Sequence, residues 1–207
     1  MFYDERMVFG KPIIRPTDLA KFVSKKLMPY AGRLQRRSAL NVNRSVKQKK
    51  SRAIRTQSLM VQLRRLGRRH KFHIFPDNRR NLRKRRPEWL VDLIWWEKTP
   101  KHTGVGLAVE SEWNAPVDDI VADFQKLLII KSPLKLMVYR VRGKDIARVR
   151  EGIRQNLLKY GQHVPGESYV LCEFLPKWKC TAYMYRVKQV NRNGTIADFE
   201  FHKINLG

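Results

Sequence analysis

The sequence predicts an α/β fold in which a mixed β-sheet carries helices on its faces, and three observations support this prediction. The chain has 207 residues, 43% of them hydrophobic, which is enough for a packed core. Runs rich in β-branched and aromatic residues alternate with segments whose apolar residues recur at helical spacing. Some predicted strands follow one another directly and others are separated by helices, so one sheet should hold both antiparallel and parallel pairs.

Residues 1–52 are predicted to form a basic extension in front of a domain that spans 53–207. In this extension Thr17 can cap a short helix that runs to about residue 27. Pro29 is expected to end that helix. The stretch 32–51 is polar and basic, so we expect an arm that is flexible until it meets a partner. The apolar stripe of the short helix consists of Leu19, Phe22, Val23 and Leu27.

The first half of the domain is predicted as a helix and three strands. The helix covers 54–66 and is expected to end at Gly67. A strand over 71–76 and a basic loop follow it. Two further strands, over 88–97 and 104–113, are joined by the short connector 98–103 and should therefore pair as an antiparallel hairpin.

The second half begins with the clearest helix of the chain, over 116–130. A strand over 134–141 and a helix over 144–160 come next. Strands over 168–175, 182–187 and 196–201 complete the domain, and the Asn and Gly residues at 191–194 predict a turn between the last two. The helix over 116–130 has an apolar face made of Val117, Ile120, Val121, Phe124, Leu127 and Leu128.

The chain is strongly basic, with 44 Lys and Arg against 18 Asp and Glu and a formal net charge of +26. Such a chain repels itself and is best explained by a polyanionic partner. Nucleic acid is favoured over an anionic membrane surface, because the predicted helices carry only ordinary core stripes. Phosphate contacts are predicted from three basic runs: Lys47, Lys49, Lys50, Arg52, Arg64, Arg65, Arg68, Arg69, Arg79, Arg80, Arg83, Lys84, Arg85 and Arg86.

Several classes of protein are disfavoured by the composition. The two cysteines, Cys172 and Cys180, provide neither a disulfide framework nor a four-ligand zinc site. No run of apolar residues is long enough for a transmembrane helix, so no membrane partner is expected. The first residues contain acids and no apolar stretch, which is unlike a secretory signal. A cytoplasmic protein that associates with nucleic acid is the expectation.

Three carboxylates lie on the predicted hairpin, where an unpaired buried charge would be costly: Asp92, Glu110 and Glu112. The two glutamates share one face of their strand, because side chains alternate along a strand. If the connector is centred near His102, Asp92 lies opposite Glu112 and shares that face. A slip of one residue would bring Glu97 to this face in place of Asp92.

Converging carboxylates repel one another, and a divalent hard cation relieves the repulsion. Mg²⁺ (or Mn²⁺) beside a basic surface is an arrangement that can hydrolyse phosphodiester bonds. The alternative is that the three acids lie on a solvated sheet face and pair with nearby arginines.

Tryptophans surround the same hairpin, at Trp89, Trp95, Trp96 and Trp113. They could stack on bases or pack in the core; we expect core packing for Trp96 and leave Trp113 open.

Asp92 followed by Glu110-Ser111-Glu112 resembles the motif of the PD-(D/E)XK, or restriction-endonuclease-like, nuclease superfamily in an E-x-E variant. The predicted order helix, three strands, helix, strand over about 52–141 is similar to the αβββαβ core of that superfamily. The segment 123–128 also resembles what many such nucleases carry after the acidic strand. The resemblance implies that Asp92, Glu110 and Glu112 ligate the metal and act in catalysis. Glu112 stands where the commoner motif has lysine, and Lys126 is the residue that could supply that charge.

Three classes of function follow from these features. The leading hypothesis is a metal-dependent endonuclease that hydrolyses DNA. The alternative is a subunit or accessory protein that binds DNA or RNA with a nuclease-like fold and does not cleave it. A structural RNA-binding protein with a basic arm is the third, disfavoured by the three carboxylates. A homodimer or a partner protein would supply specificity, because the chain is too short for a large specificity domain.

Overall fold

The computed structural model of the chain describes residues 7–8, 11–12, 14–36, 44–76, 90–98, 103–175 and 179–207. At 7–8, 11–12, 28–36, 44–54, 98 and 103 it describes the backbone alone. The elements in chain order are β1 (Met7–Val8), β2 (Lys11–Pro12), α1 (Pro16–Arg36), α2 (Arg44–Arg69), β3 (His73–Phe75), β4 (Leu93–Lys98), β5 (Thr103–Trp113), α3 (Val117–Ile129), β6 (Leu134–Arg140), η2 (Gly143–Asp145), α4 (Ile146–Lys159), β7 (Ser168–Phe174), β8 (Cys180–Val190) and β9 (Ile196–Ile204).

In the described part of the chain, seven strands form one mixed sheet in the order β3-β4-β5-β6-β7-β8-β9. The pairs within β3-β4-β5 and within β7-β8-β9 are antiparallel. The central pairs β5-β6 and β6-β7 are parallel, and α3 and α4 make the two crossovers that parallel pairs require. The predicted mixed α/β fold and the order of its helices and strands from α2 onward are confirmed.

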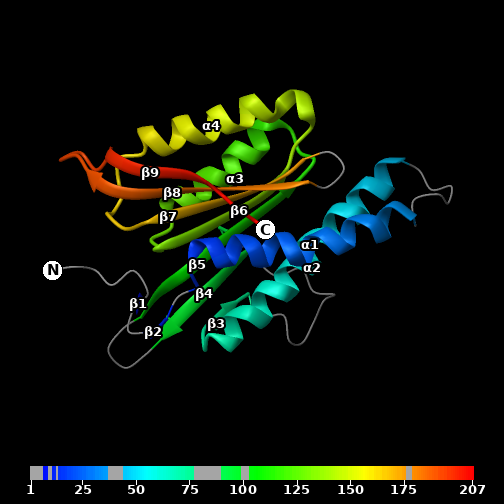
Figure 1. Ribbon diagram of the computed structural model, residues 1–207, viewed down its shortest axis with the longest axis horizontal. Coiled ribbons are helices and arrows are strands. Elements are labelled where there is room, and N and C mark those ends of the chain that lie inside the picture. Colours follow the sequence, from blue (N-terminus) through cyan, green and yellow to red (C-terminus); the bar gives the residue numbers. More distant parts are fainter. Residues whose placement is uncertain are drawn as a thin grey trace.

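The helices cover the two faces of this sheet in pairs (Figure 1). Residues of α1 and α2, among them Leu19, Val23 and Leu63, share one buried apolar cluster with the sheet. Residues of α3 and α4, among them Phe124 and Ile153, share the other. The predicted apolar stripes therefore face the core. The boundary at residue 52 falls inside α2, and the division into an extension and a domain stays a prediction.

Both N-terminal helices are longer than the sequence predicted. Helix α1 passes Pro29 and ends at Arg36, since a proline inside a helix removes one backbone hydrogen bond without always ending it. Helix α2 begins at Arg44, so part of the arm predicted to be flexible is helical. It also continues past Gly67 to Arg69. Polar, basic sequence carries no core stripe, and this is why pattern alone missed these ends.

Gly67 serves close packing instead of ending the helix. A Cβ atom at this position would lie 2.5 Å from Ile74 Cδ1 and 2.7 Å from the Trp95 ring. A glycine in a helix costs about 1 kcal/mol relative to alanine. Here it lets α2 lie directly on β3 and β4, which places the rest of α2 over the hairpin.

The hairpin of β4 and β5 has a different register from the predicted one. Near the turn Lys98 pairs with Thr103, and farther along Leu93 pairs with Val109. Between Trp95 and Trp96 the pairing shifts by one residue, which leaves Gly106 of β5 as the extra residue of a β-bulge. A Cβ atom on Gly106 would lie 2.8 Å from Phe72 Cε1, so a glycine fits the bulge.

The strand that carries the first aspartate is shorter than expected. Strand β4 begins at Leu93, and Asp92 therefore precedes the strand. The predicted pairing of Asp92 with Glu112 is wrong, because the register of Leu93 with Val109 leads instead from Asp92 towards Glu110. Alternation along a strand cannot reveal a bulge, and the connector centre assumed from the sequence was too far along the chain.

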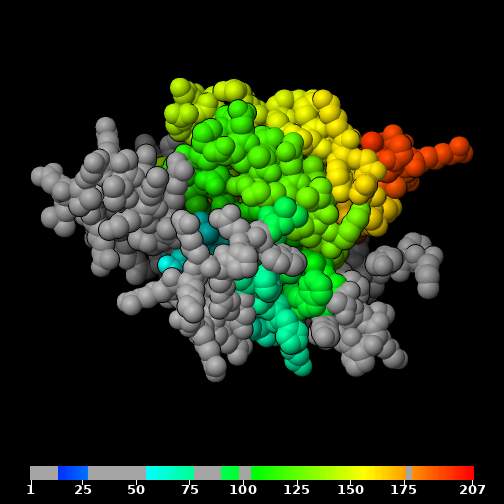
Figure 2. Space-filling model, turned by 180° about the vertical axis from the view of Figure 1, so that it is seen from behind, coloured from blue at the N-terminus to red at the C-terminus, as the bar shows by residue number. Residues whose placement is uncertain are grey.

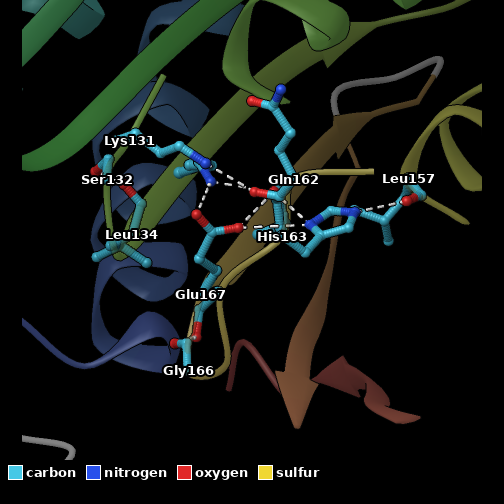
Figure 3. A network of polar contacts seen from close by, with 11 residues as sticks. Lys131, Ser132, Leu134, Leu157, Gln162, His163, Gly166 and Glu167 are labelled. Carbon is cyan, nitrogen blue, oxygen red and sulfur yellow. Dashed lines mark hydrogen bonds and ion pairs between the residues drawn. The ribbon is translucent and has the colours of Figure 1, made fainter. Parts of the chain in front are cut away.

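A buried polar network ties the loop before β7 to β6 (Figure 3). The Lys135 side chain is fully buried, and its Nζ lies 2.9 Å from Glu167 Oε1. Lys135 Nζ also donates to Tyr169 Oη at 3.0 Å, and Tyr169 Oη donates to Glu167 Oε2 at 3.1 Å. His163 Nε2 donates to the carbonyl of Leu157 at 2.7 Å at the end of α4. The Lys135 cation thus has an anion and a hydroxyl as partners, as burial of a charge requires.

Candidate functional site

Four charged side chains meet where the hairpin lies against α3. Asp92 precedes β4, Glu110 lies in β5, and Asp123 and Lys126 lie one turn apart on α3. Lys126 Nζ lies 2.6 Å from Asp123 Oδ1 and 3.6 Å from Glu110 Oε1. Glu110 is buried, with 3% of its surface exposed, whereas the Lys126 side chain is 40% exposed. We name Asp92, Glu110, Asp123 and Lys126 the acidic cluster.

The carboxylate of Asp92 is held by the strand that carries Glu110. Its Oδ2 accepts the backbone N–H of Ser111 at 2.9 Å and the Ser111 hydroxyl at 2.8 Å. Ser111 Oγ lies 3.4 Å from Thr56 Oγ1 of α2, and Thr56 Oγ1 accepts the indole N–H of Trp113 at 3.1 Å. Helix α2 therefore contacts the residue that fixes Asp92.

Burial and mutual repulsion shift the titration of these acids. Burial, with the nearby charges of Asp92 and Asp123, raises the pKa of Glu110 to about 9. Burial also raises the pKa of Asp92, although the two hydrogen bonds from Ser111 oppose the shift. Burial lowers the pKa of Lys126, but Asp123 and Glu110 outweigh it and the net shift is upward. Such perturbed, mutually coupled groups are typical of functional sites.

Glu112, the third predicted metal ligand, does not have the predicted position opposite Asp92. Glu112 is half-buried, and its Oε1 accepts the backbone N–H of Trp113 at 2.9 Å. It lies level with Tyr139 of β6, two residues farther along β5 than Glu110. Within the described ranges, no group of three or more His, Cys, Asp and Glu side chains is arranged to hold a metal ion. The structure therefore brings Asp92, Glu110 and Lys126 together, with Asp123 as the third nearby acid.

Glu110→Gln is expected to reduce the loss of stability as the pH rises. The folded chain keeps the proton of Glu110 up to about pH 9, whereas the ordinary pKa of this group is 4.5. Between these values the folded state binds more protons than the unfolded state, so the free energy of unfolding falls with rising pH. At about pH 8 the amide should raise that free energy by several kcal/mol, because the wild type loses up to about 1.4 kcal/mol for each pH unit above 4.5.

The measurement is urea unfolding of both proteins at about pH 5 and about pH 8 in the presence of EDTA. Asp119→Asn removes one exposed negative charge from α3 and controls for the change in net charge. Parallel pH dependence in the wild type and Glu110→Gln would contradict the burial of a protonated Glu110.

The predicted basic residues divide between the two ends of α2. Arg64, Arg65, Arg68 and Arg69 lie on its last turns, and all but Arg64 are exposed. Lys47, Lys49, Lys50 and Arg52 lie on its first half, at most three turns before Thr56. Arg79, Arg80, Arg83, Lys84, Arg85 and Arg86 lie outside the described residues.

The tryptophans near the hairpin are mainly core residues. Trp95 and Trp113 are each 1% exposed, and the Trp113 ring packs on Phe174 at 5.7 Å between centroids. Base stacking by Trp113 is thereby excluded, and Trp96, for which we expect core packing, is partly buried and packs against the core cluster. Trp89 lies outside the described residues. Cys172 is buried and Cys180 partly exposed, and both are free thiols.

Sequence reasoning missed three residues of the site. Asp123 entered only as part of the segment 123–128, although its spacing of three residues from Lys126 on a predicted helix indicates an ion pair. Ser111 stood between the two glutamates and was given no role. Thr56 carried no signal, because its contact with Ser111 depends on how α2 packs over the sheet.

Among the described residues, no helix is long and apolar enough to cross a membrane. Comparison of the chain with protein-family models, with curated proteins and with solved structures found no match. The fold and the acidic cluster are therefore the basis for assigning a function.

Proposed function

We propose that this chain is a metal-dependent nuclease of the PD-(D/E)XK kind that hydrolyses phosphodiester bonds in DNA. The observation that carries the proposal is the pair Asp92 and Glu110, held side by side next to Lys126 in a chain of net charge +26. Burying acids together costs free energy, and their proximity is explained if the pair binds a cation.

Two carboxylates suit Mg²⁺ or Mn²⁺ bound to a phosphate, because Mg²⁺ commonly takes one or two carboxylates and keeps several waters. Asp92 and Glu110 would hold the ion, and Glu112 stays a candidate for a third ligand. When bound, the ion would polarise the phosphoryl group and lower the pKa of a bound water. Ser111 orients the Asp92 carboxylate, and Asp123 holds Lys126 beside Glu110.

The architecture supports the proposal in two further respects. The order α2, β3, β4, β5, α3, β6 accords with the αβββαβ core of the superfamily. The basic first half of α2 leads along the chain to Thr56, which contacts Ser111 beside Asp92. Phosphates drawn to this half of the helix would come close to the acidic cluster.

A specific observation favours the non-catalytic alternative. Lys126 lies within 4.0 Å of both Glu110 and Asp123 and offsets part of their charge without a metal. In this second candidate function the chain binds nucleic acid, and the cluster only fastens α3 to β5.

A cleavage assay separates the two functions. The wild type is incubated with supercoiled plasmid, linear DNA and RNA, each with Mg²⁺, Mn²⁺ or EDTA. The nuclease proposal expects cleavage of DNA with either cation and none with EDTA. Binding of DNA without cleavage under all these conditions would favour the alternative.

Neutralising basic residues is expected to weaken DNA binding equally across sequences. Replacing Arg65, Arg68 and Arg69 by glutamine should flatten the slope of log K against log salt, by about 0.9 for each duplex phosphate that the protein no longer neutralises. The same is expected for the arginines at 79–86. Binding is measured by fluorescence anisotropy over a series of salt concentrations.

The matched control replaces three exposed cations by glutamine on or next to α4, on the opposite face of the sheet: Lys144, Arg148 and Lys159. An equal flattening of the slope in this control would mean that net charge alone sets the affinity, and that α2 makes no particular contribution.

A further inference from the structure

The β8-β9 hairpin carries a row of aromatic rings at the free edge of the sheet. The row consists of Tyr183, Tyr185, Phe199 and Phe201, and we name it the aromatic row. The Phe201 ring lies 4.5 Å from Tyr185 and 6.0 Å from Tyr183 between centroids, and Tyr185 lies 5.8 Å from Phe199. The end of this hairpin projects from the body of the molecule (Figure 2).

All four rings share the face of the sheet that α4 covers. The register pairs Tyr185 with Phe201 and Tyr183 with Lys203, so these side chains point to one side. Phe201 is 50% exposed, and no strand pairs with β9 on its other side in the described residues. The three other rings are partly buried, and two of them, Tyr183 and Tyr185, pack against Phe201.

Cations flank the row on the same face. Arg150 Cζ of α4 lies 5.1 Å from the Tyr183 ring centroid, and Arg150 Nη2 donates to Tyr183 Oη at 2.7 Å. Arg154 follows one turn later on α4, 44% exposed, and pairs with Glu151. Lys203 is exposed and lies opposite Tyr183, at the same end of the row as Arg150.

The acids of β9 lie away from the rings. Glu200 pairs in register with Arg186 and lies 3.3 Å from His202, and both partners point to the opposite face from Phe201. Glu173, beneath α4, is fully buried and held by Arg150 at 2.7 Å. The exposed surface around Phe201 therefore combines aromatic rings with Lys203 and with two arginines that are ion-paired, Arg150 with Glu173 and Arg154 with Glu151.

We propose that the aromatic row binds unpaired bases of single-stranded nucleic acid. A base can stack on the exposed ring of Phe201, while Arg150, Arg154 and Lys203 lie where they can attract neighbouring phosphates. The proposal rests on the nucleic-acid part of the proposed function and is independent of cleavage. The proposed ligand is a nucleic-acid strand with exposed bases, because the rings offer a stacking surface and the chain carries a net charge of +26.

The test measures binding by fluorescence anisotropy in EDTA, with three labelled probes. They are an oligothymidylate of about 16 nucleotides, within the site sizes of single-strand binders, an abasic strand of equal length, and a duplex. The wild type should bind the oligothymidylate more tightly than the abasic strand. Phe201→Ala should lower affinity for the oligothymidylate about tenfold and leave the other two probes unchanged.

Two further variants at Phe201 and one at Phe75 separate the effect of stacking from an effect on folding. Phe201→Leu keeps an apolar side chain and should lose nearly as much affinity, whereas Phe201→Trp should keep it. Phe75→Ala removes a 41% exposed ring from β3, at the other edge of the sheet, and should bind like the wild type. Circular dichroism and thermal melting establish that each variant is folded.

The results of this test distinguish a failure of the stacking inference from a failure of the proposed function. Binding of the duplex with no preference for exposed bases, or with no effect of Phe201→Ala, overturns this inference alone. In that case the aromatic row either only stabilises the pairing of β8 with β9 or binds a protein. Absence of binding to all three probes overturns both this inference and the nucleic-acid part of the proposed function.

Discussion

Replacing Asp92 by asparagine is expected to abolish DNA cleavage and to leave DNA binding intact or tighter. The amide keeps the size of the side chain and can still accept the hydrogen bonds of Ser111. It removes one of the two anionic ligands proposed for the metal ion. Loss of several kcal/mol of stabilisation of the transition state corresponds to a rate lower by roughly a thousandfold or more. One fewer negative charge near the phosphates favours binding.

The assay compares wild type, Asp92→Asn and the control Asp119→Asn, prepared identically, with Mg²⁺ and with EDTA. Asp119 is exposed on α3, and its variant should cut like the wild type. Lys126→Ala in the same assay should lower the rate constant more than the affinity if its charge acts at the transition state. Cleavage by Asp92→Asn at the rate of the wild type would mean that the site assignment is wrong.

Replacing Lys135 by methionine is expected to destabilise the fold by about 3–5 kcal/mol, because Glu167 then stays buried without its cation. Burial lowers the pKa of Lys135, and the charge of Glu167 opposes that shift. The burial of Glu167 favours a raised pKa, but His163, Lys135 and Tyr169 outweigh it and the net shift is downward. Each ion thus depends on the other for its charged state.

Urea unfolding measures the loss, with Lys144→Met as the control at an exposed position. Adding Glu167→Gln to the Lys135 variant should recover part of the lost stability, since no uncompensated charge then remains buried. If the single variant proves as stable as the wild type, the Lys135–Glu167 pair contributes nothing and the loop at 161–167 is held by other contacts.

The sheet and the helices of its α3 and α4 face could be predicted from the sequence because their patterns are periodic. Val117 to Leu128 repeat at helical spacing, and the strands are separated by clear turn residues. The ends of α1 and α2 could not be predicted from the sequence, because local rules treat Pro29 and Gly67 as helix ends. Packing of α2 on Trp95 explains Gly67, and that contact joins residues far apart in the chain.

The candidate site was predicted in its parts and not in its arrangement. Asp92, Glu110 and Lys126 were identified, and the structure places them together. From the sequence, Glu112 is expected opposite Asp92, because that register assumes a turn centred near His102 and an unbroken alternation of side chains along both strands. Asp123 enters through its position on α3, one turn before Lys126. Register errors of this kind arise whenever a bulge is hidden inside a strand.

The bulge at Gly106 has a consequence for how this strand can change in length. Trp96 pairs with Val105 and Trp95 with Leu107, so the residue between Val105 and Leu107 has no partner position of its own. If Gly106 were deleted, every residue pair between β4 and β5 could remain. Asp92 would then keep its position level with Glu110. Deletion of Ala108 would instead move Leu107 to the opposite face of the sheet and put Gly106 in its place opposite Trp95. In an alignment of homologous chains, a gap of a single residue in this strand is therefore expected at Gly106.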